Sequence, residues 1–116
     1  MSGSFKARNS LQGHKGNYRK KVGATLVCCL NKASALLNDS ANDIFYTNCI
    51  CQKIHDICWQ IKDAYRGEVP VLATNGQSPE ELIEAVRGRV ERDGTISGAE
   101  REKIIEGLNA VLAMID

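Results

Sequence analysis

The sequence is poor in the features that mark several common classes of protein. It contains only two prolines and few runs of β-branched residues, which argues against an all-β fold. It contains no run of about 18 apolar residues, so no segment is expected to span a membrane. Its N-terminal segment is polar and basic and has no apolar stretch typical of a secretory signal. These absences favour a helical protein of the cytoplasm. In that compartment the five cysteines of the chain are expected to remain as reduced thiols.

Acidic residues are absent from the first 38 residues, which contain seven Lys and Arg. The other 78 residues contain eight Lys and Arg and fourteen Asp and Glu, although the net charge of the whole chain is only +1. Such an asymmetry predicts that the basic end binds an external anion, or else the acidic part of its own chain or of a second copy.

The hydrophobic pattern predicts an all-α fold, in which two helical hairpins with four main helices form a small bundle. Residues 1–17 are rich in Ser, Gly, Asn and Lys and are typical of a flexible basic arm. We expect a long helical hairpin over 18–66, a linker over 67–77 and a C-terminal hairpin over 78–116.

Capping residues predict where the helices begin. Ser40 is expected to cap a second helix that runs from Ala41 to Arg66 and stops at Gly67. Ser78, followed by Pro79 and by Glu81 at the third helical position, gives the strongest start in the chain.

The segment NCICQKIHDICWQI holds three of the five cysteines and one of the two histidines. On a helix, Cys51, His55 and Cys58 share one strip, and Cys29 of the preceding helix can approach them, so a zinc site of these four residues is geometrically conceivable. Structural zinc sites usually carry C-x₂₋₄-C pairs, and this chain has none. Catalytic cysteines usually lie at a helix N-terminus, whereas these lie mid-helix. We therefore expect buried, reduced thiols, with no metal and no cofactor.

The same helix has apolar residues on two sides. A seam that includes Ile50, Ile54 and Ile61 faces one way, whereas Phe45 and Trp59 face the other. A hairpin covers only one side, so the other side must meet the second hairpin or another copy, and we expect a homo-oligomer. The expected interface residues are Phe45, Ile50, Ile54, Trp59 and Ile61, with Trp59 as the anchor.

The stretch RVERDGTISGAE resembles the calcium loop of an EF-hand over twelve residues. Gly94, Ile96 and Glu100 fit the glycine, the central aliphatic residue and the last ligand of that loop. Arg89 stands at the first ligand position, where the family has Asp, and its positive charge opposes a divalent cation. Without calcium, Gly94 ends one helix and Ser97 with Glu100 caps the next, so we expect a connector between helices.

The basic end offers a set of residues for an anionic partner. Three consecutive basic residues follow Tyr18, which can stack on a base or hydrogen-bond a phosphate. The alternatives are an acidic protein surface, such as Glu80, Glu81 and Glu84 of another copy, or a solvated tail. The candidate residues are Lys6, Arg8, Lys15, Tyr18, Arg19, Lys20 and Lys21.

Neither a Ser/His/Asp set nor paired inward carboxylates nor a glycine-rich phosphate loop is evident, so we do not expect an enzyme. The pattern favours a small helical binding or regulatory protein that self-associates and engages an anionic partner, either nucleic acid, a phosphorylated ligand or an acidic protein surface. In outline it is similar to small helical regulators and inhibitors carried by phages and other mobile elements. The alternative is a zinc-stabilised helical module that uses Cys29, Cys51, His55 and Cys58.

Overall fold

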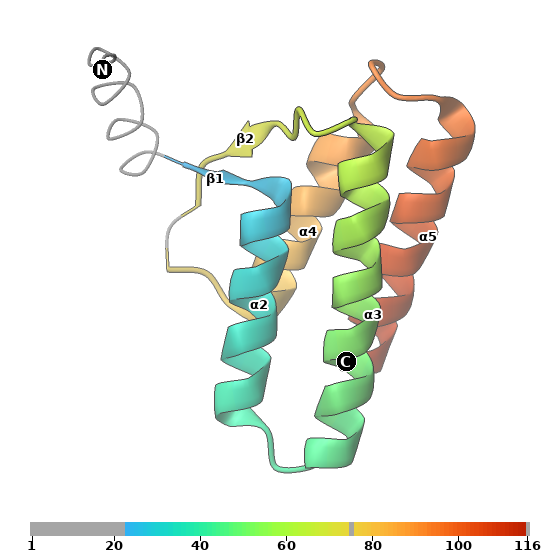
Figure 1. The fold of residues 1–116 in the computed structure, drawn as a ribbon. Helices are drawn as coiled ribbons and strands as arrows, with labels where there is room; N and C mark the ends of the chain where they lie inside the picture. Colours follow the sequence, from blue (N-terminus) through green and yellow to red (C-terminus); the bar gives the residue numbers. More distant parts are fainter. Residues whose placement is uncertain (1–22, 75, 116) are drawn as a thin grey trace, which may run out of the picture.

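The computed structural model describes residues 23–74 and 76–115, and within them it confirms the small all-α bundle. Four helices account for most of the described chain, and a pair of two-residue strands joins them at one end (Figure 1). The elements are β1 (Ala24–Thr25), α2 (Leu26–Ser40), α3 (Ile44–Ala64), β2 (Val71–Leu72), α4 (Pro79–Glu91) and α5 (Gly98–Ile115).

The four helices form a ring in which each packs mainly against two others. Helix α2 contacts α3 and α4, and α5 contacts the same two helices from the opposite side. All of these neighbours run antiparallel, because α3 and α4 point the same way and the segment between them returns along the length of the bundle (Figure 1). The bundle therefore consists of two hairpins, α2–α3 and α4–α5, packed side by side.

The core lies between the four helices and is almost entirely aliphatic. Each helix contributes residues at three- and four-residue steps, which is the spacing that places them on one face. Burying a side chain of this size typically contributes about 1.5–3 kcal/mol. The largest fully buried side chains are Leu26, Leu30, Ile54, Ile61, Leu82, Ile83, Ile104, Leu108, Val86, Val90, Val111 and Cys29.

The first helix begins later than the sequence predicts. We expected helix from about Tyr18; residues 18–22 lie outside the described residues, but residues 23–25 are not helical. Thr25 is the N-cap, and its hydroxyl accepts a hydrogen bond from the backbone N–H of Cys28 at 3.1 Å. A side-chain acceptor satisfies one of the free amides of the first turn, and this fixes the start of α2.

The connection between α2 and α3 also differs from the expectation. Ser40 is the last residue of α2, where its hydroxyl donates to the carbonyl of Leu36 at 3.0 Å, so its assignment as an N-cap is wrong. Asp43 takes that role, because its carboxylate accepts from the backbone N–H of Tyr46 at 3.1 Å. At the other end of α3, Arg66 and Gly67 adopt left-handed φ values of 54° and 86°, close to the predicted stop.

The linker is more ordered than its composition indicates. Its residues Val71 and Leu72 form β2, which pairs antiparallel with β1 in the register Ala24–Leu72 and Thr25–Val71. Gly23 lies so close to β2 that a Cβ atom there would come within 2.6 Å of the Val71 side chain. The strand pair therefore fastens the segment after α3 to the segment before α2.

The capping predictions for the second hairpin are confirmed at α4. Ser78 and Glu81 form a complete capping box, with Pro79 at the first turn. Before α5, the Ser97 hydroxyl accepts from the backbone N–H of Glu100 and donates to its carboxylate. Both helices thus start at the residues whose side chains can replace the missing backbone acceptors.

Candidate interaction surface on helix α3

Helix α3 carries the most exposed large apolar side chains of the described chain. Phe45 is 83% exposed, Ile44 is 73% exposed and Trp59 is 54% exposed. At 100° per residue, Phe45 and Trp59 lie on the same side of the helix, although they are almost four turns apart. The exposed residues between them on this side of the helix complete what we call the α3 strip: Phe45, Asn48, Cys49, Gln52, His55, Asp56 and Trp59.

The opposite side of α3 is occupied by the protein's own core. Ile50, Ile54 and Ile61 are at most 3% exposed and pack within the bundle. These three isoleucines, expected at the interface together with Phe45 and Trp59, therefore belong to the core of this chain. Periodicity alone does not distinguish a helix face that packs internally from one that packs on a partner. The surface left for a partner is the α3 strip.

Trp59 is held in position by two neighbours on its own helix. The Lys62 ammonium group lies over the indole ring, 4.9 Å from its centroid, which is a cation–π contact. The His55 ring meets the indole edge-on, with 6.5 Å between the centroids. These contacts restrict the rotation of an exposed side chain, and so reduce the conformational entropy that it would lose on binding.

Phe45 forms one wall of a shallow hollow on the strip. The hollow has a volume of about 450 Å³, and its walls are mainly apolar. Asn48, Cys49 and Gln52 complete it, one helical turn and two helical turns along from Phe45. Residues at steps of three, four and seven surround the space into which a side chain of a packed helix inserts. Sequence reasoning did not single out Asn48, although its spacing from Phe45 was a sufficient signal.

The structure does not bring the four proposed zinc ligands together. Cys29 is buried and its thiol donates to the Leu82 carbonyl of α4. The thiols of Cys51 and Cys58 donate to carbonyls of α2 instead, at 3.8 and 3.9 Å, while His55 is exposed beside Trp59. Within residues 23–74 and 76–115, His, Cys, Asp and Glu side chains form no group of three or more that could hold a metal ion.

The buried thiols are poorly suited to act as nucleophiles. Burial raises the pKa of Cys58 to about 11, against a smaller opposing effect of Lys62. Burial likewise raises the pKa of Cys29 above its ordinary value. The reactive form of cysteine is the thiolate, and a raised pKa keeps these two groups protonated near neutral pH.

The segment that resembles a calcium loop is held by hydrogen bonds within the protein. The Asp93 carboxylate accepts from both the backbone N–H and the hydroxyl of Thr95, and from the Tyr65 hydroxyl at 2.8 Å. The Arg101 guanidinium donates to the Asp93 carbonyl at 3.1 Å. Asp93 therefore anchors the α4–α5 connection to the end of α3, as a connector between helices requires.

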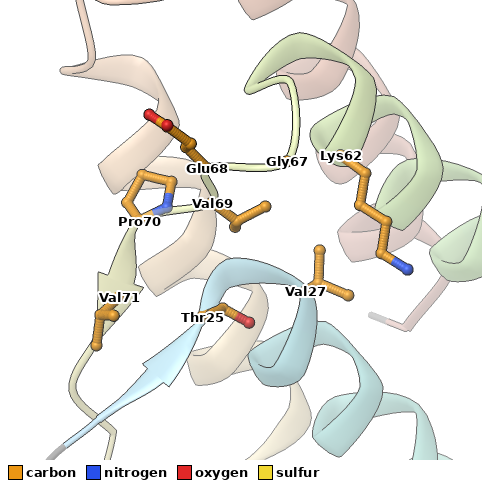
Figure 2. A pocket seen from close by; sticks show the side chains of 8 residues that line it. All are labelled: Thr25, Val27, Lys62, Gly67, Glu68, Val69, Pro70 and Val71. Carbon is orange, nitrogen blue, oxygen red and sulfur yellow. The ribbon is translucent and has the colours of Figure 1, made fainter. Parts of the chain in front are cut away.

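A second hollow lies at the end of the bundle where the strands meet (Figure 2). The Thr25 hydroxyl there already caps α2, and the Lys62 and Glu68 side chains point in opposite directions (Figure 2). This arrangement does not assemble a catalytic pair. The residues around it are Thr25, Val27, Lys62, Gly67, Glu68, Val69, Pro70 and Val71.

The candidate anion-binding residues of the arm lie outside the described residues. The acidic residues proposed as their alternative partners lie at the surface, on the first two turns of α4. They are Glu80, Glu81 and Glu84. Among the helices that the structure describes, none is long and apolar enough to cross a membrane. No family model, no curated protein and no solved structure matches the chain.

Proposed function

We propose that this protein is a non-enzymatic helical binding protein that self-associates through the α3 strip and engages an anionic partner with its basic arm. The observation that carries the proposal is the exposure of Phe45 and Trp59 on a helix whose opposite face is already buried. Exposed aromatic residues at helical spacing are typical of interface anchors. A small regulator or inhibitor needs such a binding surface and no catalytic centre.

The environment of the ionisable groups supports a binding role. Burial raises the pKa of Cys29 and of Cys58, and burial together with the hydrogen bond to Asp93 raises that of Tyr65. Each of these groups has a structural partner in the bundle: Cys29 and Cys58 donate to backbone carbonyls and Tyr65 donates to a carboxylate. Their perturbed pKa values are thus accounted for by packing, without a substrate.

The difference in charge between the two ends of the chain supports the proposal of an anionic partner. The first 22 residues contain six Lys and Arg and no acidic residue, whereas the remainder of the chain carries a net negative charge. A polyanion that neutralises the arm releases its counterions, so the affinity should fall steeply with added salt. The alternative partner of the arm is an acidic surface on a second copy of the chain. In that case the arms would already be bound within the oligomer and would not bind an added polyanion.

The proposal is tested by measuring the molar mass in solution by light scattering. We expect the wild-type protein to be a dimer or larger species under reducing conditions. Replacing both anchors in the neutral double variant Phe45→Gln with Trp59→Gln should give a folded monomer, because both side chains lie outside the core. Val71→Thr, which makes an exposed apolar side chain outside the strip polar, should leave the mass unchanged. A wild-type monomer at all concentrations would refute self-association.

A further inference from the structure

The α3 strip is arranged symmetrically about Gln52. Phe45 and Trp59 each lie seven residues from it, one on either side, and point within about 20° of the direction in which Gln52 points. Asn48 and Asp56 each lie four residues away. The strip therefore has an aromatic residue at each end and short polar residues in its middle, and all of these side chains are exposed.

On the basis of the proposed self-association, we propose that two copies of α3 pack antiparallel about a two-fold axis at Gln52. The occupant of the strip is thus a second copy of this chain. A two-fold interface joins the same patch on both subunits, so the patch must be complementary to itself after a half-turn. The arrangement about Gln52 meets this condition, because the half-turn brings Phe45 of each copy to the level of Trp59 of the other.

The aromatic ends fit together in this arrangement. Phe45 and Trp59 lie about 10.5 Å from the axis along the helix, on opposite sides. Helical side chains lean toward the N-terminus of their own helix, so Trp59 of the second copy leans back toward the axis. This places its indole ring over the hollow formed by Phe45, Asn48, Cys49 and Gln52. The contact with Lys62 already holds each indole in place.

The middle of the strip fits as well. Gln52 uses one amide N–H to donate to Asp56 of its own helix at 3.2 Å. A carboxamide has a second N–H and a carbonyl, which can pair with the same group of the second copy across the axis. The two Asp56 carboxylates lie eight residues apart along the paired helices, or about 12 Å. At physiological ionic strength that exceeds the screening length of about 8 Å, so their repulsion is weak.

The register predicts which positions can be joined by a disulfide. Gln52 lies on the axis, so cysteines introduced there face each other at the close approach of two packed helices. Cys49 is three residues from the axis, and the two copies of it are offset by about 9 Å, beyond the usual Cα separation of about 4.4–6.8 Å for a disulfide. The native exposed thiol is therefore not expected to link the subunits, even under oxidising conditions.

The experiment compares the oxidation of a cysteine introduced at each of two positions, while the less exposed Cys29, Cys51 and Cys58 remain in both variants. In a background in which the exposed cysteines are removed (Cys28→Ser with Cys49→Ser), one variant carries Gln52→Cys and the matched control carries Asp56→Cys. Both positions are exposed and on the same helix, so chance collisions link them equally. After oxidation with copper phenanthroline, non-reducing electrophoresis should show the Gln52→Cys chain linked at least about tenfold faster than the control. Circular dichroism confirms that both variants are folded.

The result separates this register from the proposed function. A protein that is dimeric by light scattering but links no faster through position 52 than through position 56 overturns the two-fold axis at Gln52, while self-association stands. Ready linking of wild-type subunits through Cys49 also overturns the axis, because it requires a register centred three residues away. A monomer at all concentrations overturns both proposals.

Discussion

At the scale of single residues, Asp93 links the stability of the bundle to pH. Hydrogen bonds from the side chain and backbone of Thr95, and then from Tyr65, hold the pKa of this carboxyl below its ordinary value. A group whose pKa is lowered by folding stabilises the protein above its unfolded pKa of about 3.9, and that contribution is lost as the pH falls through the lower, folded value.

We therefore expect Asp93→Asn to lower the free energy of unfolding by about 1 kcal/mol at pH 7 and by clearly less at pH 3. Urea denaturation at the two pH values measures the difference. Asp39→Asn removes the same charge from an exposed position and should show no comparable change between the two values. If Asp93→Asn costs as much at pH 3 as at pH 7, the ionised carboxylate is not what the hydrogen bonds stabilise.

Asp93 also marks a limit of sequence reasoning. Its place in a loop that resembles a calcium site was visible in the sequence, where the charge of Arg89 argued against calcium. The hydrogen bond from Tyr65, 28 residues away, was not predictable, because no local pattern specifies which end of a helix approaches a turn. Long-range contacts of this kind follow only from the packing of whole helices.

At the scale of helices and strands, Asp43 and Ser40 test which residue fixes the start of α3. Asp43 accepts from the first turn of α3, whereas Ser40 is already inside α2. We expect Asp43→Ala to lower the free energy of unfolding by about 1 kcal/mol, and Ser40→Ala to change it by less than about 0.5 kcal/mol. Chemical denaturation of the two variants checks this, and the reverse order would restore Ser40 as the cap.

The four helices were predictable because each carries a sustained apolar stripe. At α4 the capping residues were predictable as well. The error at Ser40 arose because Ser40 and Asp43 are both good caps three residues apart, and propensity alone does not choose between them. The strands β1 and β2 were missed because two residues are too short to show alternation. Their pairing depends on the close approach of Gly23 to Val71, which is a property of the folded chain.

At the scale of the whole molecule, the candidate site was predicted in part. The sequence placed Phe45 and Trp59 away from the isoleucine seam, and the structure leaves both exposed. It did not show that Ile50, Ile54 and Ile61 would all be buried within the bundle, because that depends on the ring in which both α2 and α5 pack against α3. Only the assembled bundle shows that one apolar side of α3 is buried and that the α3 strip stays exposed.

The proposed self-association and the proposed anion-binding arm have a joint consequence, because a dimer would carry two arms. Two arms that reach one polyanion bind it more tightly than either alone, through the high effective concentration of the second arm. We expect the neutral double variant Phe45→Gln with Trp59→Gln to bind a single-stranded oligonucleotide of roughly 50 nucleotides at least about tenfold more weakly than the wild type. Binding to one of roughly 10 nucleotides, which engages a single arm, should change by less than about twofold.

Fluorescence anisotropy at fixed salt measures both affinities, and the neutral substitutions leave the charge of the protein unchanged. Lys20→Ala with Lys21→Ala is the matched variant at the basic end of the chain, and it should weaken both complexes because it removes two positive charges that attract phosphate groups. Equal losses for the long and the short oligonucleotide in the strip variant would place the α3 strip itself in the nucleic-acid interface. Loss for the long one alone would indicate that the strip acts by joining two arms, because each arm then retains its own affinity.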